Sequence, residues 1–222
     1  MELQNKQLGL ITYWQKGENP ELLIHTGTHG DEWRVIEPTM EYIENHYKEL
    51  PDFIYVAKVS PSAVEKKTRR NINNLDLNRQ FLKNATEQEA IDNLLIINQF
   101  DFKTFLSIHE DVEYKDFYLY DNGEIENSKW QSFVEKLNDF NINVLNGIDD
   151  PKDPELGTEF VNGYFSTNKP GFKEAMGCLS EYVQLYKPGK RMLVPEIPTH
   201  STNEQKKQII NLIFTDLLTI IK

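Results

Sequence analysis

A histidine and a glutamate three positions apart, His29 and Glu32, are the first residues along this chain whose types and spacing could bind a metal ion. On a helical turn or a tight bend, side chains with this spacing point the same way. An imidazole nitrogen and a carboxylate oxygen together suit Zn²⁺. Two polar residues at a helix start are more often simply solvated, so a metal site also requires a third ligand from another part of the chain.

His109 is the candidate third ligand, and it follows an apolar run at residues 105–108. Two histidines and one carboxylate would leave one position of a tetrahedral zinc ion open, which is the arrangement of catalytic rather than structural sites. The alternative is a surface histidine at the end of a strand. We expect His25, which precedes His29 at the end of another apolar run, to support the site from below.

A second group of candidate residues lies in the loop at residues 69–81, which holds three arginines and several amides in a strongly acidic protein. The guanidinium group is a planar fork that can grip a carboxylate with two hydrogen bonds. Arg79 and its neighbour Asn78 are therefore candidates for binding an anionic group, with Arg69 and Arg70 as further cations nearby. The alternative is an ordinary solvated loop with surface arginines.

Strands and helices alternate along the chain and must position these residues. Short apolar runs predict strands at residues 8–14, 22–26, 53–57, 105–108, 116–121 and 177–180. Apolar residues at helical spacing predict helices at residues 33–47, 86–100 and 130–140, and a capping box of Thr202 and Gln205 begins a final helix. The alternation predicts an α/β fold with a mixed, mostly parallel central sheet and helices on both faces. Ligands of such sheets bind at the carboxyl ends of the strands, which is where His29, His109 and Glu181 fall.

The composition indicates a soluble globular protein with one domain at residues 1–222. Apolar residues make up 39% of the chain, and 35 acidic residues against 24 Lys and Arg give a net charge of −11. This balance argues against nucleic-acid binding, which needs a basic face. The single cysteine, Cys178, has small and apolar neighbours, which predicts a buried, unreactive thiol. The N-terminus shows no signal-peptide pattern and no apolar run is long enough to cross a membrane, so we expect a cytoplasmic protein that does not bind membranes.

The segment Asp76-Leu77-Asn78-Arg79-x-Phe81 resembles the D-L-N-R-x-F signature of the zinc carboxypeptidase superfamily, which includes the aspartoacylase and succinylglutamate desuccinylase group. The order of the motifs is also similar: an H-x-x-E pair, the arginine-rich loop, a ligand histidine, and a glutamate after a run of small residues. The resemblance extends from about residue 8 to residue 221. It implies an α/β/α fold of the carboxypeptidase type, which is phosphorylase/hydrolase-like, and one bound Zn²⁺.

The resemblance also implies which residues would carry out hydrolysis. His29, Glu32 and His109 would hold the zinc ion, which polarises the scissile carbonyl and acidifies water. Glu181 would take the water proton and deliver it to the leaving nitrogen. Glu174 is the competing glutamate, but it lies in a segment with a helical pattern.

The groups that hold the substrate follow from the same resemblance. Asn78 and Arg79 would bind a free carboxylate beside the scissile amide, and an upstream arginine would stabilise the oxyanion. Arg69 fits the spacing from residues 61–64, whereas Arg70 is nearer the spacing to Asn78 and is preferred. Tyr164 is similar in position to the mobile tyrosine of carboxypeptidases, with a packed loop aromatic as the equal alternative.

Three functions fit these residues. The first is a metallocarboxypeptidase that releases a C-terminal residue, favoured by His109-Glu110-Asp111 and by the short stretch that follows Glu181. The second is an N-acyl-amino-acid deacylase, favoured by the lead-in Pro61-x-Ala63-Val64. Both would act on a small peptide or N-acyl amino acid with a free carboxylate beside the amide. The third is a non-catalytic carboxylate-binding module, which would not need a catalytic glutamate.

Overall fold

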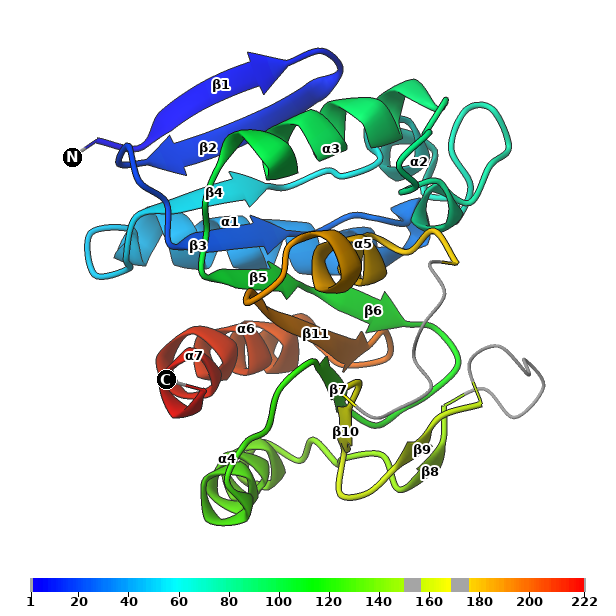
Figure 1. Ribbon diagram of the computed structural model, residues 1–222. Helices are drawn as coiled ribbons and strands as arrows, with labels where there is room; N and C mark the ends of the chain where they lie inside the picture. Colours follow the sequence, from blue (N-terminus) through cyan, green and yellow to red (C-terminus); the bar gives the residue numbers. More distant parts are fainter. Residues whose placement is uncertain (1, 150–156, 169–175, 222) are drawn as a thin grey trace.

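Nine strands form one mixed sheet in the described part of the chain, residues 2–149, 157–168 and 176–221 of the computed structural model (Figure 1). The central strands are parallel, in the order β4 (Phe53–Val56), β3 (Leu22–His25), β5 (Thr104–Ser107) and β11 (Arg191–Pro198). The short strand β6 (His109–Asp111) continues beyond β5 and pairs with the end of β11. The predicted α/β fold with a mixed, mostly parallel sheet is therefore confirmed.

Antiparallel pairing occurs towards the two edges of this sheet. On one side, β2 (Ile11–Lys16) lies antiparallel to β4 and is followed by β1 (Gln4–Leu8). On the other side, β7 (Tyr118–Asp121) lies antiparallel to β11 and is followed by β10 (Tyr164–Ser166). A separate two-stranded ladder joins β8 (Gly147–Ile148) and β9 (Glu159–Phe160).

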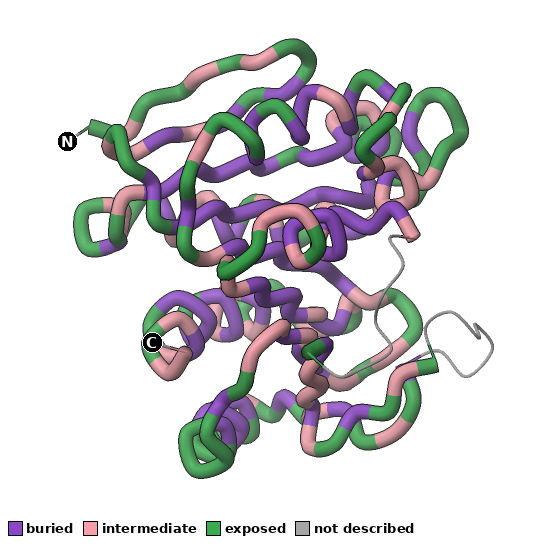
Figure 2. Tube along the Cα trace, viewed as in Figure 1, coloured by how far each residue is buried: buried purple, intermediate pink, exposed green. Residues whose placement is uncertain are grey.

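Helices cover both faces of the sheet. One apolar core contains residues of α1 (Ile36–His46), α4 (Asn127–Asp139) and α6 (Asn203–Leu212), and the other contains residues of α3 (Gln88–Gln99) and α5 (Leu179–Tyr186) (Figure 1). Alternate residues of β3 face opposite cores, because successive side chains of a strand point to opposite faces. Leu22 and Ile24 join the first core and Leu23 joins the second. Figure 2 shows the result, since the central strands are almost continuously buried.

The C-terminal part of the chain begins where the sequence predicted. Thr202 and Gln205 form a reciprocal capping box at the start of α6. The helix then continues through a π-helical turn, η3 (Ile213–Leu217), into α7 (Leu218–Ile220). Within the described ranges, none of the helices has the length and apolar character that crossing a membrane requires.

The N-terminal elements differ in detail from the prediction. The single strand expected at residues 8–14 is a hairpin of β1 and β2, which reverses at Gly9, where φ is +56°. The helix predicted at residues 33–47 is divided in the structure between η1 (Gly30–Val35) and α1. Pro38 lies in the first turn of α1, where a missing N–H removes no helical hydrogen bond.

The strand predicted at residues 177–180 is wrong, because this segment starts helix α5. Glu181 accepts a hydrogen bond from the N–H of the N-cap residue Cys178, which is one half of a capping box. Cysteine is an unusual N-cap residue, so this helix start could not be predicted from a common capping residue.

Candidate active site

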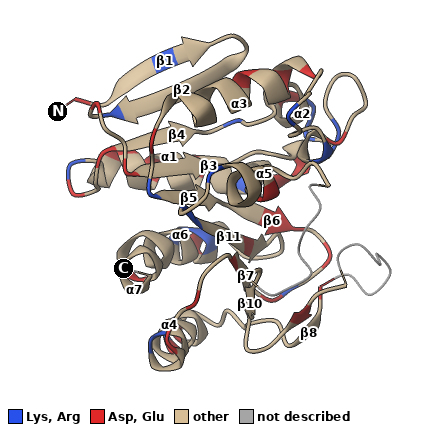
Figure 3. Ribbon diagram, viewed as in Figure 1, with Lys and Arg blue, Asp and Glu red and all other residues tan. Residues whose placement is uncertain are grey.

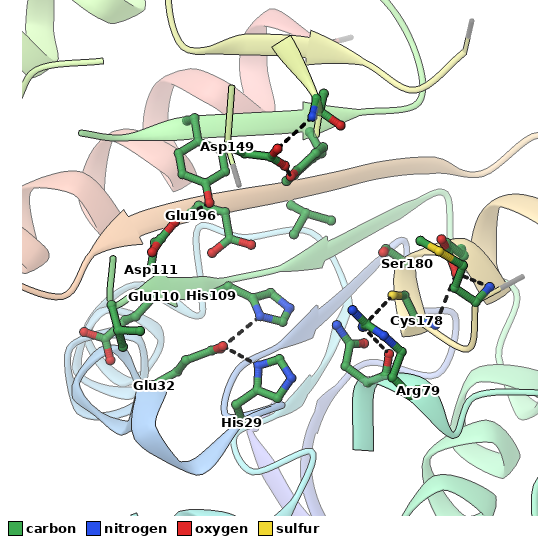
Figure 4. Close-up of a pocket in the computed structure, with 18 of the residues that line it drawn as sticks. His29, Glu32, Arg79, His109, Glu110, Asp111, Asp149, Cys178, Ser180 and Glu196 are labelled. Atoms are coloured by element: carbon green, nitrogen blue, oxygen red, sulfur yellow. Dashed lines mark hydrogen bonds and ion pairs between the residues drawn. The ribbon is translucent and has the colours of Figure 1, made fainter. Parts of the chain in front are cut away.

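The three predicted metal ligands lie together at the carboxyl ends of the parallel strands. His29 follows β3, Glu32 lies in η1, and His109 begins β6. The ligand atoms of the three residues all lie within 4.8 Å of one another, and all three residues are buried. The two carboxylate oxygens of Glu32 face the Nδ1 atoms of the two histidines, and the contact to His109 is 2.9 Å (Figure 4).

Each histidine also contacts a further residue through its other ring nitrogen, Nε2. His29 Nε2 lies 3.1 Å from Asp76 Oδ1, and His109 Nε2 lies 3.0 Å from Ser107 Oγ. Such contacts fix the ring orientation of metal-binding histidines. Two oriented Nδ1 atoms and one buried carboxylate are a donor set that fits Zn²⁺ with a fourth position open.

The three residues are strongly coupled electrostatically. Burial opposes a charge on His29, but Glu32 and Asp76 outweigh it and raise the pKa of His29 to about 9. Burial likewise opposes ionisation of Glu32, yet His109 and His29 hold its pKa well below the usual range. Glu32 is thus a charged carboxylate in the protein interior, a state that requires neighbouring cations.

His25 lies behind the site at the end of β3, fully buried. Its ring centroid is 5.0 Å from that of Phe105, in an edge-on arrangement. Burial, with His109, lowers the pKa of His25 to about 3, so the ring is neutral. It does not line the cavity that contains the metal ligands.

Close backbone packing positions the His29–Glu32 turn. A Cβ atom on Gly30 would lie 1.9 Å from the carbonyl oxygen of Ala63 in α2 (Pro61–Lys66), and the Gly30 N–H donates to Thr68 O at 3.0 Å. Only glycine allows this approach. This close approach lets η1 pack on α2 and keeps His29 and Glu32 on the same side of the turn.

Glu196 is a site residue that the sequence reasoning missed. It lies on β11, in register with His109 on β6, and Figure 4 shows it beside the His109 ring. Burial, followed by Glu32 and Asp111, raises its pKa well above the usual value. One signal could have found it: Glu196 is the acidic residue within the otherwise apolar run at residues 192–198.

Glu181 lies in the same cavity but on helix α5, not at a strand end. Its Oε2 atom accepts hydrogen bonds from the backbone N–H groups of Met176 at 2.9 Å and Cys178 at 3.2 Å. Burial raises its pKa despite these donors and the charge of Arg79. Glu196, not Glu181, is therefore the glutamate in register with a metal ligand. The competing Glu174 lies outside the described residues.

The structure separates Arg69 from Arg70. Arg69 lines the cavity and contacts Asp76 through Nε at 3.0 Å and a terminal nitrogen at 2.9 Å. Arg70 is exposed, donates to Asn74 O at 3.0 Å, and lines a neighbouring groove instead of the main cavity. The preference for Arg70 from sequence spacing is thus reversed, because residues 69–74 turn its side chain away from the ligands.

Asn78 and Arg79 line the cavity, as the arginine-rich loop predicted. Asn78 Oδ1 accepts a hydrogen bond from the Leu179 N–H at 3.0 Å, which fixes the amide group. Arg79 donates to the Asn78 carbonyl at 3.0 Å and to Cys178 Sγ at 3.3 Å, both of them neutral acceptors. The guanidinium therefore has no carboxylate among these hydrogen-bond partners, and it faces a cavity in which a ligand could supply one.

Tyr164 does not join these residues. Its hydroxyl donates to Asp121 Oδ2 at 2.7 Å, and its ring packs 5.3 Å from the Trp130 ring, outside the cavity. The alternative reading, a packed aromatic, is the one that the structure supports. Two other tyrosines line the cavity instead: Tyr118 donates to Asp111, and Tyr120 donates to Asp149.

One cavity of about 480 Å³ is lined by the three candidate metal ligands, by Glu181 and Glu196, and by Arg69, Asn78 and Arg79. Among the described residues, eight carboxylates line it against two arginines. In Figure 3, acidic residues mark β6 and the start of α5, while the arginine-rich loop lies near α2. The arrangement could bind a metal ion, hold an anionic group on the Arg79 side and move a proton at Glu196.

No protein-family model matches the chain, and no curated protein matches it. Solved structures do. A candidate metallopeptidase from Shewanella denitrificans superposes with a TM-score of 0.75 and 16% identity, covering 98% of this chain and 83% of that one. A metallo-carboxypeptidase from Burkholderia cenocepacia gives a TM-score of 0.67 and 14% identity, covering 99% of this chain and 64% of that one. An aspartoacylase family protein from Mesorhizobium loti gives a TM-score of 0.53 and 20% identity, covering 91% of this chain and 60% of that one.

These identities establish likeness of fold. The chain therefore shares the fold of these three proteins, and the fold expected from the resemblance of the D-L-N-R-x-F segment is confirmed.

Proposed function

We propose that this protein is a zinc-dependent hydrolase that cleaves an amide bond next to a free carboxylate, as a metallocarboxypeptidase does. One arrangement carries the proposal. The buried His29, Glu32 and His109 set lies between Glu196 on one side and the Asn78–Arg79 pair on the other, all within one cavity. A metal site, a base and a carboxylate anchor in a single cavity are the parts that this reaction requires.

The chain's own residues would act as follows. Zn²⁺, when bound, supplies a Lewis acid for the scissile carbonyl and lowers the pKa of water. Arg79 would bind the substrate carboxylate through its planar fork, and Asn78 would add a neutral donor. Arg69, held by Asp76, would donate to the developing oxyanion. Glu196 would accept the proton of the attacking water and return it to the leaving nitrogen.

The second candidate is an N-acyl-amino-acid deacylase. The fold likeness to an aspartoacylase family protein and the Pro61-x-Ala63-Val64 segment, which starts α2, both favour it. The same anchor would serve both reactions, because the leaving amino acid keeps its carboxylate in each. The peptidase is preferred because the superpositions with the candidate metallopeptidase and the metallo-carboxypeptidase are closer, at TM-scores of 0.75 and 0.67.

The test is to measure metal content and then turnover on peptides and N-acyl amino acids, each with a free or an amidated carboxylate. We expect Glu196→Gln to keep the metal and to lose about 10²- to 10⁴-fold in kcat, the usual contribution of general acid–base catalysis. Glu181→Gln is the matched variant and should retain far more activity. Wild-type turnover in Glu196→Gln, or a severe loss confined to Glu181→Gln, would return the catalytic role to Glu181. Bound metal with no hydrolysis of any such substrate would favour the non-catalytic binding module.

A further inference from the structure

A second groove adjoins the candidate active site, and its charged side chains are all cations. It has a volume of about 410 Å³, and Arg69 lines both this groove and the main cavity. The lining residues all come from the segment 66–74, which contains four of the chain's 24 lysines and arginines and no acidic residue. Figure 3 shows this positive charge at α2 and the adjoining loop. The proposed reaction gives no role to two of the lining cations, Lys66 and Arg70.

These two cations lack an anionic partner. No carboxylate of the described residues lies within ion-pair distance of Lys66 or Arg70. Arg70 donates instead to the neutral carbonyl of Asn74, at 3.0 Å. Arg69 differs from them, because its guanidinium is already paired with Asp76 at 2.9 Å. The groove therefore offers two positive charges to a ligand, in a protein whose net charge is −11.

Hydrogen bonds to the rest of the molecule hold the groove in shape. The buried Asn71 side chain accepts from the Asn73 N–H at 3.0 Å and donates to Glu87 at 2.9 Å. The Ile72 N–H donates at 3.0 Å to the hydroxyl of Ser62, which lies on α2. Because the loop is fixed before a ligand arrives, little ordering of the backbone opposes binding.

The donors of the groove indicate the chemistry of its ligand. A guanidinium grips an oxyanion with two hydrogen bonds, and an ammonium adds a further charge. Two unpaired cations match a dianion better than a single carboxylate, and a phosphate group carries such a charge on three acceptor oxygens. Ile72 lines the same groove and is 63% exposed, so it adds apolar surface for the organic part of an ester. We propose that this groove binds a phosphate dianion, either the free ion or the end of a small phosphate monoester.

The test follows backbone amide signals by NMR while inorganic phosphate, phenyl phosphate or acetate is added to the intact protein in chloride buffer. We expect the amides of residues 66–74 to shift to saturation with phosphate, and acetate to bind at least about tenfold more weakly. Arg70→Ala and Lys66→Ala should each weaken phosphate binding at least about fivefold. Tighter binding of phenyl phosphate would support a monoester as the ligand, and equal affinities would support the free ion.

Two control variants separate the groove from other cationic positions. Arg79→Ala removes the proposed carboxylate anchor of the main cavity, and Lys129→Ala removes an exposed charge on α4. Both should keep the phosphate affinity within about twofold, since neither side chain lines the groove. Unchanged affinity in Arg70→Ala, loss of binding in Arg79→Ala alone, or acetate bound as tightly as phosphate would overturn the inference. None of these outcomes depends on turnover, so the proposed function is tested separately.

Discussion

Asp76 contacts two residues to which the proposed function gives roles. Its Oδ1 atom lies 3.1 Å from His29 Nε2, and its Oδ2 atom accepts from Arg69 Nε at 3.0 Å. Burial opposes its ionisation, but His29 and Arg69 hold its pKa below the usual range. One carboxylate therefore orients a candidate metal ligand and fixes a guanidinium beside it, which explains why Arg69 and not Arg70 faces the cavity.

Kinetics of the two arginine variants would test this distinction. We expect Arg69→Ala to lower kcat about 100-fold, since it removes a donor to the developing oxyanion. Arg70→Ala removes an exposed guanidinium that contacts the Asn74 carbonyl, so its kcat should stay within about twofold of the wild type. Steady-state assays on one substrate compare them. An equal or larger loss in Arg70→Ala would contradict the assignment.

The grouping of the three candidate metal ligands could be predicted because its signal is local. His29 and Glu32 are three residues apart, and His109 follows an apolar run, so strand ends alone bring them to one edge of the sheet. Glu196 could not be preferred over Glu181 in the same way. Both follow short apolar stretches, and what separates them is the register of β11 with β6, a contact that pairs Glu196 with a residue 87 positions earlier, His109.

A buried ion pair joins the secondary-structure elements that contain the site residues. The Lys206 ammonium on α6 contacts Glu110 Oε1 at 3.0 Å and donates to the carbonyls of Pro198 and Thr199 at 2.9 and 3.0 Å. Glu110 Oε2 accepts from the Arg34 N–H at 2.9 Å. One ammonium therefore links η1, β6 and the end of β11, which carry Glu32, His109 and Glu196.

Breaking this pair should loosen all three elements. Burial raises the pKa of Glu110 and lowers that of Lys206, so each charge depends on the other. We expect Lys206→Met to lower the free energy of unfolding by about 3–5 kcal/mol, because it leaves Glu110 buried and unpaired. The double variant Lys206→Met/Glu110→Gln should recover part of that loss. Urea unfolding measures both, and a double variant less stable than Lys206→Met would contradict the account.

The start of a helix could be predicted from the sequence where its N-cap residue is a common one. Thr202 is a common N-cap residue, and α6 begins directly after it. Cys178 is not, so the sequence predicts a strand at residues 177–180, whereas Glu181 lies in the first turn of a helix. Likewise, residues 8–14 contain one apolar run but two paired strands, because Gly9 permits a turn that hydrophobicity alone does not reveal.

At the scale of the whole molecule, the alternation of predicted strands and helices indicated a mostly parallel sheet with helices on both faces. It did not indicate the order of the strands in that sheet. β11 enters between β5 and β7, so the last strand of the chain lies beside strands formed some 70 to 90 residues earlier. Short-range patterns carry no information about such pairings. The cavity consequently combines segments from η1, the arginine-rich loop, β6, α5 and β11, and its acidic character is a property of the assembled fold.

Because the metal ligands come from separate segments of the fold, metal binding should stabilise the molecule as a whole. An ion that binds only the folded state at about 1,000 times its Kd adds about 4 kcal/mol. For a chain of this size, that corresponds to a rise in Tm of roughly 8–16 °C. We expect chelator-treated protein to show this shift when Zn²⁺ is restored, as measured by thermal unfolding. Glu32→Gln removes the ligand charge between the two histidines and is the control, since its Tm should respond far less to Zn²⁺. An equal shift in wild type and Glu32→Gln would place the stabilising ion elsewhere and contradict the assignment of this site.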